Sequence, residues 1–218
     1  EIPDNLIDDD NNGYIDDFIG YDFVTVPASE VSPGEDPGPP DNDPMDVYGH
    51  GTHSSGIVAA VKNNAVGIAG VSPGSKIMAL RAGYKTPSGS ALLQSSAIES
   101  AIVYAIDNGV SIISMSFGSY SADRPYRDEI QTAYSENIVL VASAGNDNTS
   151  EPRYPAAYSE VIAVAAIDRN DQRPLWSNYG SWVDVAAPGV SIISTYADDS
   201  TPYVIWDGTS FACPHVSG

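Results

Sequence analysis

Side chains able to perform nucleophilic and acid–base chemistry gather in two stretches rich in glycine and serine. The first is Gly49-His50-Gly51-Thr52-His53, and the second is residues 208–218, which hold Ser210 and His215. All three histidines of the chain lie in these two stretches. A histidine can take the proton of a serine hydroxyl and so make it a nucleophile. The clustering therefore favours chemistry over the structural role of most single histidines.

Ser210 lies where a strand is predicted to give way to a helix. Residues 203–206 are rich in aromatic and β-branched side chains, Asp207-Gly208 is a turn signal, and Thr209-Ser210 is typical of a helix start. Pro214 is expected in the first turn of that helix. Backbone N–H groups at a helix start can stabilise an oxyanion. The alternative is that Ser210 only caps a buried helix.

His50 and His53 are three residues apart in the stretch 49–61, whose second half is predicted to be a helix of small and apolar residues. Such a spacing places both rings on one helical face and could hold a metal ion. The usual catalytic zinc pattern, however, has histidines four residues apart with a glutamate between them. We therefore expect acid–base chemistry here rather than a metal site.

An acidic loop near the start of the chain has the pattern of the first half of a calcium-binding loop. Side-chain oxygens alternate, Gly13 allows a sharp turn, and a backbone carbonyl can complete the set. The expected ligands are Asp8, Asp10, Asn12, Tyr14 and Asp16. An EF-hand would need a glutamate where Ile19 stands, so the loop is not an EF-hand. Carboxylates this crowded repel one another without a cation, which favours calcium over a solvated acidic turn.

Composition bounds the class of protein. The 218 residues include 9 basic and 29 acidic side chains, which give a net charge of −20 and argue against nucleic acid or anionic membranes as partners. No apolar run approaches the ~20 residues that cross a membrane. The single cysteine, Cys213, excludes an internal disulfide framework. The length fits one domain. The first residues look like the middle of a loop and the last lie inside a predicted helix, so we expect a fragment of a longer chain.

Strands and helices are predicted to alternate through the middle of the chain. Strands are expected over residues 18–26, 76–81, 110–115, 138–143, 161–167 and 182–187, and helices over 95–108 and 128–136. This order implies an α/β fold, a mostly parallel sheet with helices on both faces. Residues 27–46 contain six prolines and predict an acidic loop, either a surface insertion or a disordered spacer. Sites in such sheets form beyond the carboxyl ends of strands, where residues 116–119 and 144–147 stand.

Three motifs resemble those of the subtilisin-like serine proteases. Gly49-His50-Gly51-Thr52-His53, Ser143-Ala144-Gly145-Asn146 and residues 208–218 are similar to that family's His, Asn and Ser motifs and stand in its order. Residues 63–73, 154–156 and 184–189 also match, and the thermitase-like branch is the most similar. The resemblance covers residues 41–218. It implies a three-layer subtilisin-like fold and a single, incomplete catalytic domain over residues 1–218, with residues 27–46 as a loop within it.

The resemblance implies a mechanism. Ser210 would attack the peptide carbonyl, His50 would act as general base, and Asn146 would stabilise the oxyanion together with the Ser210 backbone N–H. Cys213 would be a packing residue, and His53 and His215 would support the site. The family's Asp-Ser/Thr-Gly motif does not occur in this chain.

Two aspartates stand where a triad carboxylate could be sought, but neither Asp22 nor Asp46 has the family's motif. The catalytic aspartate is therefore expected upstream of Glu1, and the family's last helices beyond Gly218. Residues 1–218 alone are expected to be inactive.

The same resemblance implies how a polypeptide substrate would bind. Two segments are similar to the edges that pair with an extended substrate, and broad specificity is expected because backbone pairing ignores side chains. They comprise Ser88, Gly89, Ser90, Ser116, Phe117 and Gly118. Asp147 and Glu151 would make the pocket rim acidic and tolerant of basic residues, or else merely share the acidic surface.

Further expectations concern calcium, partners and location. Asn64, Val66 and Ile68 resemble the family's tight calcium loop, so Ca²⁺ is expected as a structural ion. A secreted, monomeric enzyme with a possible inhibitory prosegment is implied. The alternatives are an inactive homologue or calcium-dependent binding module, and an acid protease of the sedolisin type. The latter has carboxylates where His50 stands, so His50 argues against it.

Overall fold

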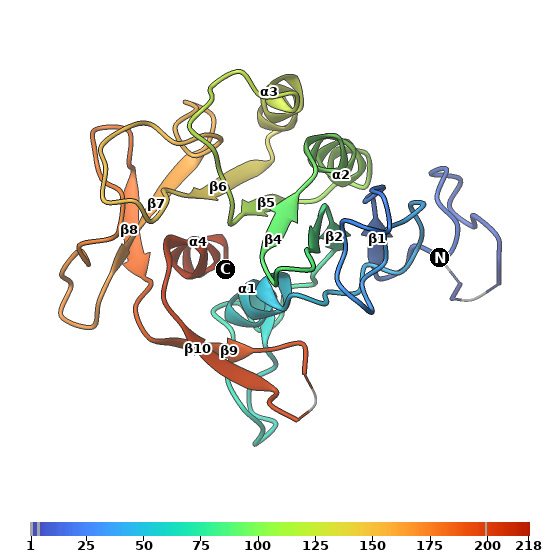
Figure 1. Ribbon diagram of the computed structural model, residues 1–218, viewed down its shortest axis with the longest axis horizontal. Coiled ribbons are helices and arrows are strands. Elements are labelled where there is room, and N and C mark those ends of the chain that lie inside the picture. Colours follow the sequence, from blue (N-terminus) through green and yellow to red (C-terminus); the bar gives the residue numbers. More distant parts are fainter. Residues whose placement is uncertain (1, 4, 199) are drawn as a thin grey trace. The chain divides into compact units, whose positions relative to one another are not determined.

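The computed structural model describes residues 2–3, 5–198 and 200–218. It divides into two compact units (Figure 1). The first comprises Glu1–Tyr48 and Ile77–Val110, and the second comprises Gly49–Lys76 and Ser111–Gly218. Each unit has a hydrophobic core of its own.

A parallel four-stranded sheet forms the centre of the second unit. Its strands are β5 (Ile112–Met115), β6 (Val139–Ser143), β7 (Ile162–Ile167) and β8 (Val185–Pro188), in that spatial order. β6 and β7 are almost entirely buried. Strands covered on both faces must be apolar throughout, which explains their runs of valine, isoleucine and alanine.

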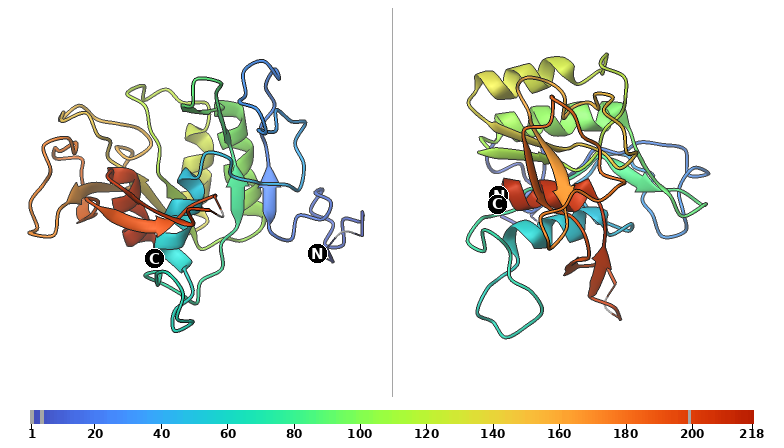
Figure 2. Two further views of the ribbon diagram at one scale, coloured as in Figure 1. Left: turned by 60° about the horizontal axis from the view of Figure 1, so that its bottom comes forward. Right: turned by 90° about the vertical axis from the view of Figure 1, so that its left-hand side faces the viewer.

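Helices cover both faces of this sheet (Figure 2). On one face, α4 (Thr209–Ser217) packs Ala212 and Cys213 against apolar side chains of β6, β7 and β8. Val141 of β6 belongs to that cluster, so strand alternation turns its neighbours Leu140 and Ala142 to the opposite face. That face is covered by α3 (Arg127–Ser135). The three-layer α/β prediction is confirmed.

A second helix, α1 (His50–Ala59), lies beside α4 and packs on the hairpin of β9 (Ile192–Thr195) and β10 (Tyr203–Trp206). A Cβ atom on Gly56 would come within 2.1 Å of Thr195 Oγ1, so only glycine allows this approach. The hydroxyls of Ser194 and Thr195 donate to the carbonyls of His53 and Thr52 at 2.7 and 2.8 Å. Strand β9 was not predicted from the sequence.

The expectation for Pro214 is wrong. Pro214 is the sixth residue of α4, not part of its first turn. A proline inside a helix cannot donate to the carbonyl four residues earlier, which here is that of Ser210. The Ser116 hydroxyl donates to this carbonyl instead, at 2.7 Å. The side chain replaces the missing helical bond, and it ties α4 to the end of β5.

The first unit combines short strands with one helix. Parallel strands β1 (Gly20–Asp22) and β2 (Ala79–Arg81) pair, β3 (Gly83–Lys85) and β4 (Ala91–Leu93) form a hairpin, and α2 (Ser95–Asp107) covers β2. Its core is unusually aromatic. The rings of Tyr14, Tyr21, Phe23 and Tyr104 lie 4.7–6.3 Å from one another, centroid to centroid.

Residues 27–46 form a loop, as predicted, with a single isolated bridge between Asp22 and Asp41 near its end. Hydrogen bonds and an ion pair fix the loop in place. Val26 N–H donates to the Pro37 carbonyl at 2.9 Å, and Ser32 N–H donates to the Lys85 carbonyl at 2.8 Å. A buried ion pair joins Glu35 to Arg81. The loop is thus anchored to β2 and β3 rather than being an unattached spacer.

Predicted helices match the structure more closely than predicted strands. The helices expected over 95–108 and 128–136 are α2 and α3 within one residue at each end. The strands expected over 18–26 and 182–187 shrink to β1 and β8, because turns and side-chain bonds to the backbone take up their ends. Among the described residues, no helix is both long and apolar enough to cross a bilayer.

Candidate active site

Ser210 is the second residue of α4, and its hydroxyl does not cap the helix. The N-cap position is Gly208, which has no side chain to make a cap bond. Ser210 Oγ instead donates to the Ser116 carbonyl at 3.2 Å, while Ser116 Oγ donates to the Ser210 carbonyl. This reciprocal pair fixes Ser210 against the segment that follows β5. The interpretation of Ser210 as only a helix cap is therefore not supported.

Asn146 is oriented by Thr209, the residue before Ser210. Its side-chain oxygen accepts from both Thr209 N–H and Thr209 Oγ1, each at 2.9 Å. Thr209 Oγ1 in turn accepts from Gly145 N–H at 2.9 Å. With its oxygen held in this way, Asn146 presents its Nδ2 atom as the donor, 3.7 Å from where a Cβ on Gly208 would lie. The sequence analysis had not identified Thr209 as an orienting residue.

His50 is the first residue of α1. It follows Gly49, whose φ of 91° and close approach to the Tyr196 ring both require glycine. The His50 ring centroid lies 5.4 Å from that of Phe211, the residue after Ser210. Packing of α1 on α4 therefore brings His50, Ser210 and Asn146 into one neighbourhood of the second unit.

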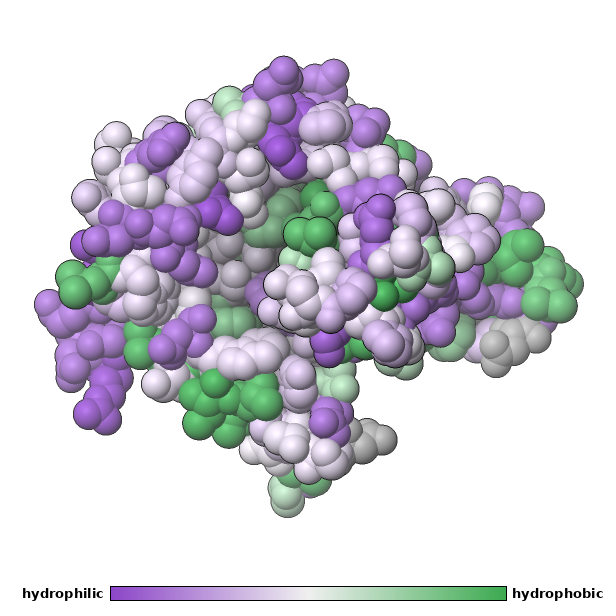
Figure 3. All heavy atoms as spheres, in the orientation of Figure 1, coloured by the Kyte–Doolittle hydropathy of each residue, from purple (hydrophilic) through white to green (hydrophobic). Residues whose placement is uncertain are grey.

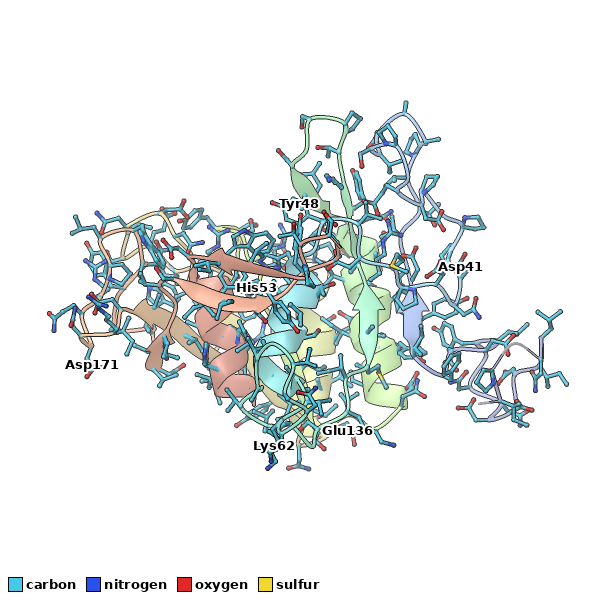
Figure 4. All side chains as sticks on the ribbon, turned by 90° about the horizontal axis from the view of Figure 1, so that it is seen from below. Asp41, Tyr48, His53, Lys62, Glu136 and Asp171 are labelled. Atoms are coloured by element: carbon cyan, nitrogen blue, oxygen red, sulfur yellow. The ribbon has the colours of Figure 1, made fainter. Side chains whose placement is uncertain are left out.

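His53 is a packing residue. Figure 4 shows it on α1 beside the β9–β10 hairpin, and its ring is fully buried between Trp206 and Phe211 at centroid distances of 5.0 and 4.4 Å. Burial lowers the pKa of His53, although the nearby carbonyls of Val204 and Ile192 oppose this. A neutral, stacked imidazole supports the site without taking part in proton transfer.

The other two side chains of the Ser210 motif that could react are held within α4. Cys213 is fully buried, and burial raises the pKa of its thiol, so little reactive thiolate forms. His215 Nδ1 bonds to the Phe211 carbonyl, one turn earlier in the same helix, at 2.8 Å. Neither side chain competes with Ser210 as the nucleophile.

A buried asparagine, Asn178, shapes the loop that carries Asn146. Its oxygen accepts from the N–H groups of Asp147 and Thr149 at 2.9 and 3.2 Å, and its Nδ2 donates to the Ala144 carbonyl at 2.9 Å. No motif in the sequence marks this residue. Its role depends on contacts between segments about thirty residues apart, which only the fold reveals.

The predicted substrate-binding residues divide between the two units. Ser116, Phe117 and Gly118 follow β5 in the second unit, where Ser119 bridges to Tyr154. The segment from Ser88 to Ser90 forms the exposed turn between β3 and β4 in the first unit. Their use as two edges of one groove remains a prediction.

Asp147 is not an isolated acidic group at the pocket rim. Arg153 Nη1 donates to its carboxylate at 2.8 Å, and the Tyr120 hydroxyl donates to the same oxygen at 2.5 Å. Glu151 is exposed. The sequence analysis had not identified Arg153 or Tyr120, although Arg153 is the one basic residue between Asn146 and Asp168.

Both aspartates considered as triad members have partners within the first unit. Asp22 is fully buried, is paired with Arg81, and accepts from Val24 N–H at 2.8 Å. Burial raises the pKa of Asp22 to about 6, against the opposing effects of Val24 N–H and Arg81. Asp46 accepts from Tyr48 N–H at 3.1 Å.

In the acidic loop, side-chain oxygens accept hydrogen bonds from the backbone N–H groups of the loop itself. Asp8 accepts from the N–H groups of Asn12 and Gly13, Asp10 accepts from Asn12 N–H, and the Asn12 oxygen accepts from Tyr14 N–H. Both oxygens of buried Asp16 hold N–H groups of residues 5 and 6, at 2.9 Å. Hard oxygen donors suit calcium, but Asp16 faces the preceding segment. The calcium prediction stays a prediction.

Two other places bear on metal binding. Asn64 accepts from Val66 N–H at 3.1 Å in an exposed loop that also carries Ile68. Within the described residues, carboxylate oxygens of Asp22, Asp36 and Asp41 lie within 4.8 Å of one another, the only such group of acidic, thiol or imidazole side chains. No histidine belongs to that group.

Comparison of this chain with known proteins identifies a family model that it matches. The model of the subtilase family, Peptidase S8, matches residues 10–218. A thermophilic serine proteinase of Bacillus sp. (strain AK1) is 44% identical over 91% of this chain and 45% of its own length. Thermitase of Thermoactinomyces vulgaris is 44% identical over 82% of this chain and 62% of its own.

Structural comparison agrees. The prenylagaramide maturation protease PagA superposes with a TM-score of 0.67 at 28% identity, over 78% of this chain and 61% of that chain. The chain therefore spans about half to two thirds of the length of the proteins that it matches.

Proposed function

Since the chain belongs to the subtilase family, we propose that it acts as a serine endopeptidase that hydrolyses peptide bonds through an acyl-enzyme. One observation carries the proposal. Thr209 and Asn146 form a hydrogen-bonded frame beside Ser210, at the start of a buried helix. This frame presents an amide donor next to a serine whose own backbone N–H lies in the first turn of α4, the arrangement that an oxyanion requires.

The proposed reaction follows from the roles of three side chains. Ser210 Oγ attacks the peptide carbonyl, and His50 takes the hydroxyl proton and then gives it to the leaving amine. Asn146 Nδ2 and Ser210 N–H donate to the oxyanion of the tetrahedral intermediate. Water then repeats the sequence on the acyl-enzyme with His50 again as general base.

A carboxylate that orients His50 is the remaining part of a Ser-His-Asp triad. Pairing with Arg81 inside the first unit argues against Asp22 in this role. No carboxylate in residues 1–218 carries the family's motif, so the triad acid is left unassigned. We expect residues 1–218 by themselves to hydrolyse peptides poorly.

The proposal extends to the substrate, the bound ion and the location of the protein. Extended polypeptides would pair with residues 116–118, with broad specificity. Structural Ca²⁺ would be held by the oxygens of the acidic loop and of residues 64–68. A monomeric, secreted enzyme with an inhibitory prosegment is proposed from the family resemblance, and the acidic composition is compatible with an extracellular setting. The competing function is an inactive homologue or a calcium-dependent binding module, against which the presence of His50, Asn146 and Ser210 argues.

Hydrolysis of a fluorogenic peptide tests the proposal, with a purified protein that includes the segments expected before Glu1 and after Gly218. Ser210→Ala should lower kcat by about 10⁴-fold or more. Ser217→Ala is the matched control, because Ser217 lies on the same helix and its hydroxyl bonds only inside the protein, to Ser114 Oγ and the Cys213 carbonyl. The control should retain activity. Equal rates for Ser210→Ala and the unaltered protein would favour the inactive homologue.

Thr209 provides a second arm of the test. Thr209→Val removes the hydroxyl that holds Asn146 and Gly145, so kcat should fall about tenfold while KM stays unchanged. Thr209→Ser keeps the hydroxyl and should restore kcat. A loss of stability without any change in kcat would assign Thr209 a purely structural role.

A further inference from the structure

Arg153 forms hydrogen bonds to two segments, residues 116–118 and residues 144–147, and Asn146 belongs to the second. Its Nη1 donates to the Asp147 carboxylate at 2.8 Å, and its Nη2 donates to the Gly118 carbonyl at 2.9 Å. Gly118 belongs to the predicted substrate-binding segment, and Asp147 directly follows the proposed oxyanion donor. One guanidinium therefore spans the space between residues 116–118 and residues 144–147.

Two glycines make room for this side chain. A Cβ on Gly145 would lie 2.5 Å from Arg153 Cδ, and a Cβ on Gly118 would lie 3.0 Å from Arg153 Nε. The contact at Gly145 cannot form, and the contact at Gly118 would push Arg153 by a few tenths of an ångström. The present position of Arg153 therefore depends on the missing side chains of both glycines. Gly145 also has a φ of 103°, which favours glycine independently. The position of Arg153 is therefore part of the fold rather than one of many surface rotamers.

The proposed function places a substrate side chain in the same space. The carbonyl under attack must put its oxygen beside Asn146 Nδ2 while the backbone runs along residues 116–118. The side chain of that substrate residue then falls between this segment and residues 144–147. Arg153 bridges that space through its bonds to Asp147 and to the Gly118 carbonyl.

The cation is more deeply placed than its partner. The Arg153 side chain is 25% exposed, whereas that of Asp147 is 52% exposed and also accepts from Tyr120. A half-exposed carboxylate is well screened by water. A guanidinium has five N–H donors, and the two bonds to Asp147 and Gly118 use two of them. An arriving carboxylate or amide thus meets a positive charge with donors to spare.

We propose that Arg153 is a specificity-determining residue that favours an acidic side chain over a basic one on the substrate residue whose carbonyl is attacked. The inference rests on the proposed function. It reverses the expectation that Asp147 and Glu151 make the pocket tolerant of basic residues. Asp147 tempers the preference by neutralising part of the arginine charge.

The test uses the protein with the segments expected before Glu1 and after Gly218 included. It compares peptides that differ only in the residue before the scissile bond, with Glu, Gln, Leu or Lys there. The unaltered protein should have a higher kcat/KM for Glu than for Lys. Arg153→Gln should lower the Glu-to-Lys ratio at least about tenfold, the factor that one hydrogen bond to a charged group supplies. Asp147→Asn should raise the ratio, because it removes the compensating charge.

Arg127→Gln is the matched control. Arg127 has a similar exposure, 27%, and pairs with Glu160 at 2.7 Å in the same unit, away from Asn146. Its ratio should equal that of the unaltered protein. An unchanged ratio in Arg153→Gln, or a lowered ratio in Asp147→Asn, would overturn the inference. If Arg153→Gln does not fold, the direction of the Asp147→Asn change decides alone. If the unaltered protein cleaves none of the peptides, the proposed function fails, and this inference fails with it.

Discussion

The two compact units are stabilised by different chemistry. The second unit is organised by apolar packing, with small side chains of α4 against a buried parallel sheet. The first unit has only short strands and relies on an aromatic cluster, on the buried pairs of Arg81, and on carboxylates that bind backbone N–H groups. Figure 3 shows polar and apolar side chains on one face of the molecule. The two units should therefore respond differently to charge removal, pH and chelators.

The acidic composition has a structural role in the first unit. Loops leave many backbone N–H groups without partners from strands or helices, and side-chain carboxylates can accept from them. The carboxylates that do so are those of Asp8, Asp9, Asp10, Asp16, Asp22, Asp36, Asp41 and Asp46, together with Glu35. Acidic side chains thus replace regular secondary structure as the partners of the main chain.

The two units should differ most in how much stability each loses when a cation of an ion pair is removed. Arg81→Met leaves Asp22 and Glu35 buried without their counter-charge, so the free energy of unfolding should fall by about 3–5 kcal/mol. Arg127→Met in the second unit breaks a partly exposed pair and should lower it by at most about 1 kcal/mol. Urea denaturation of both variants measures the difference. Equal losses would contradict the contrast between the units.

A pH effect of intermediate size is expected from Asp22. Its pKa is 3.8 before burial and about 6 in the folded protein, so the folded state binds the proton more tightly. Its contribution to stability is then fully present below about pH 4 and is lost as pH rises to about 6. Relative to Asp22→Asn, the unaltered protein should gain up to about 3 kcal/mol between pH 7 and pH 4. If the difference in the free energy of unfolding between the two proteins is constant from pH 4 to pH 7, burial does not raise the pKa of Asp22.

Calcium binding to the acidic loop of the first unit should produce the smallest shift. If the acidic loop binds the ion, a chelator should lower the melting temperature, since a ligand at a hundred times its Kd contributes about 2.7 kcal/mol. Asp10→Ala should remove much of that sensitivity, while Asp171→Ala, an exposed aspartate of the second unit, should retain it. Identical chelator responses in both variants would assign the loop a structural role without an ion.

Apolar periodicity explains which elements could be predicted. Helices α2 and α3 have amphipathic patterns, and strands β6 and β7 are continuous apolar runs, so local sequence reveals them. Strand β9 contains Ser194 and Thr195, whose hydroxyls bond to α1, and this polar content hid it. The prediction that Pro214 lies in the first turn of α4 was wrong because a long-range bond from Ser116 compensates for its missing N–H.

The candidate site likewise contains residues that local motifs predict and residues that only the fold reveals. His50, Asn146 and Ser210 were identified because each lies in a recognisable motif. Thr209, Asn178 and Arg153 act through contacts with residues 6–63 positions away, and no local pattern records such contacts. The acidic loop was recognised, but the bonds from its oxygens to its own backbone were not. Long-range polar contacts are thus what the sequence leaves undetermined.

The central claim is that Ser210 is a nucleophile. Labelling with a fluorophosphonate probe tests it most directly, in the purified protein that includes the segments expected before Glu1 and after Gly218, followed by mass spectrometry of the modified peptide. The account predicts one covalent adduct, on Ser210, that is absent in Ser210→Ala and strongly reduced in His50→Ala, because His50 activates the hydroxyl. An adduct on Cys213, or labelling that persists in Ser210→Ala, would contradict the account.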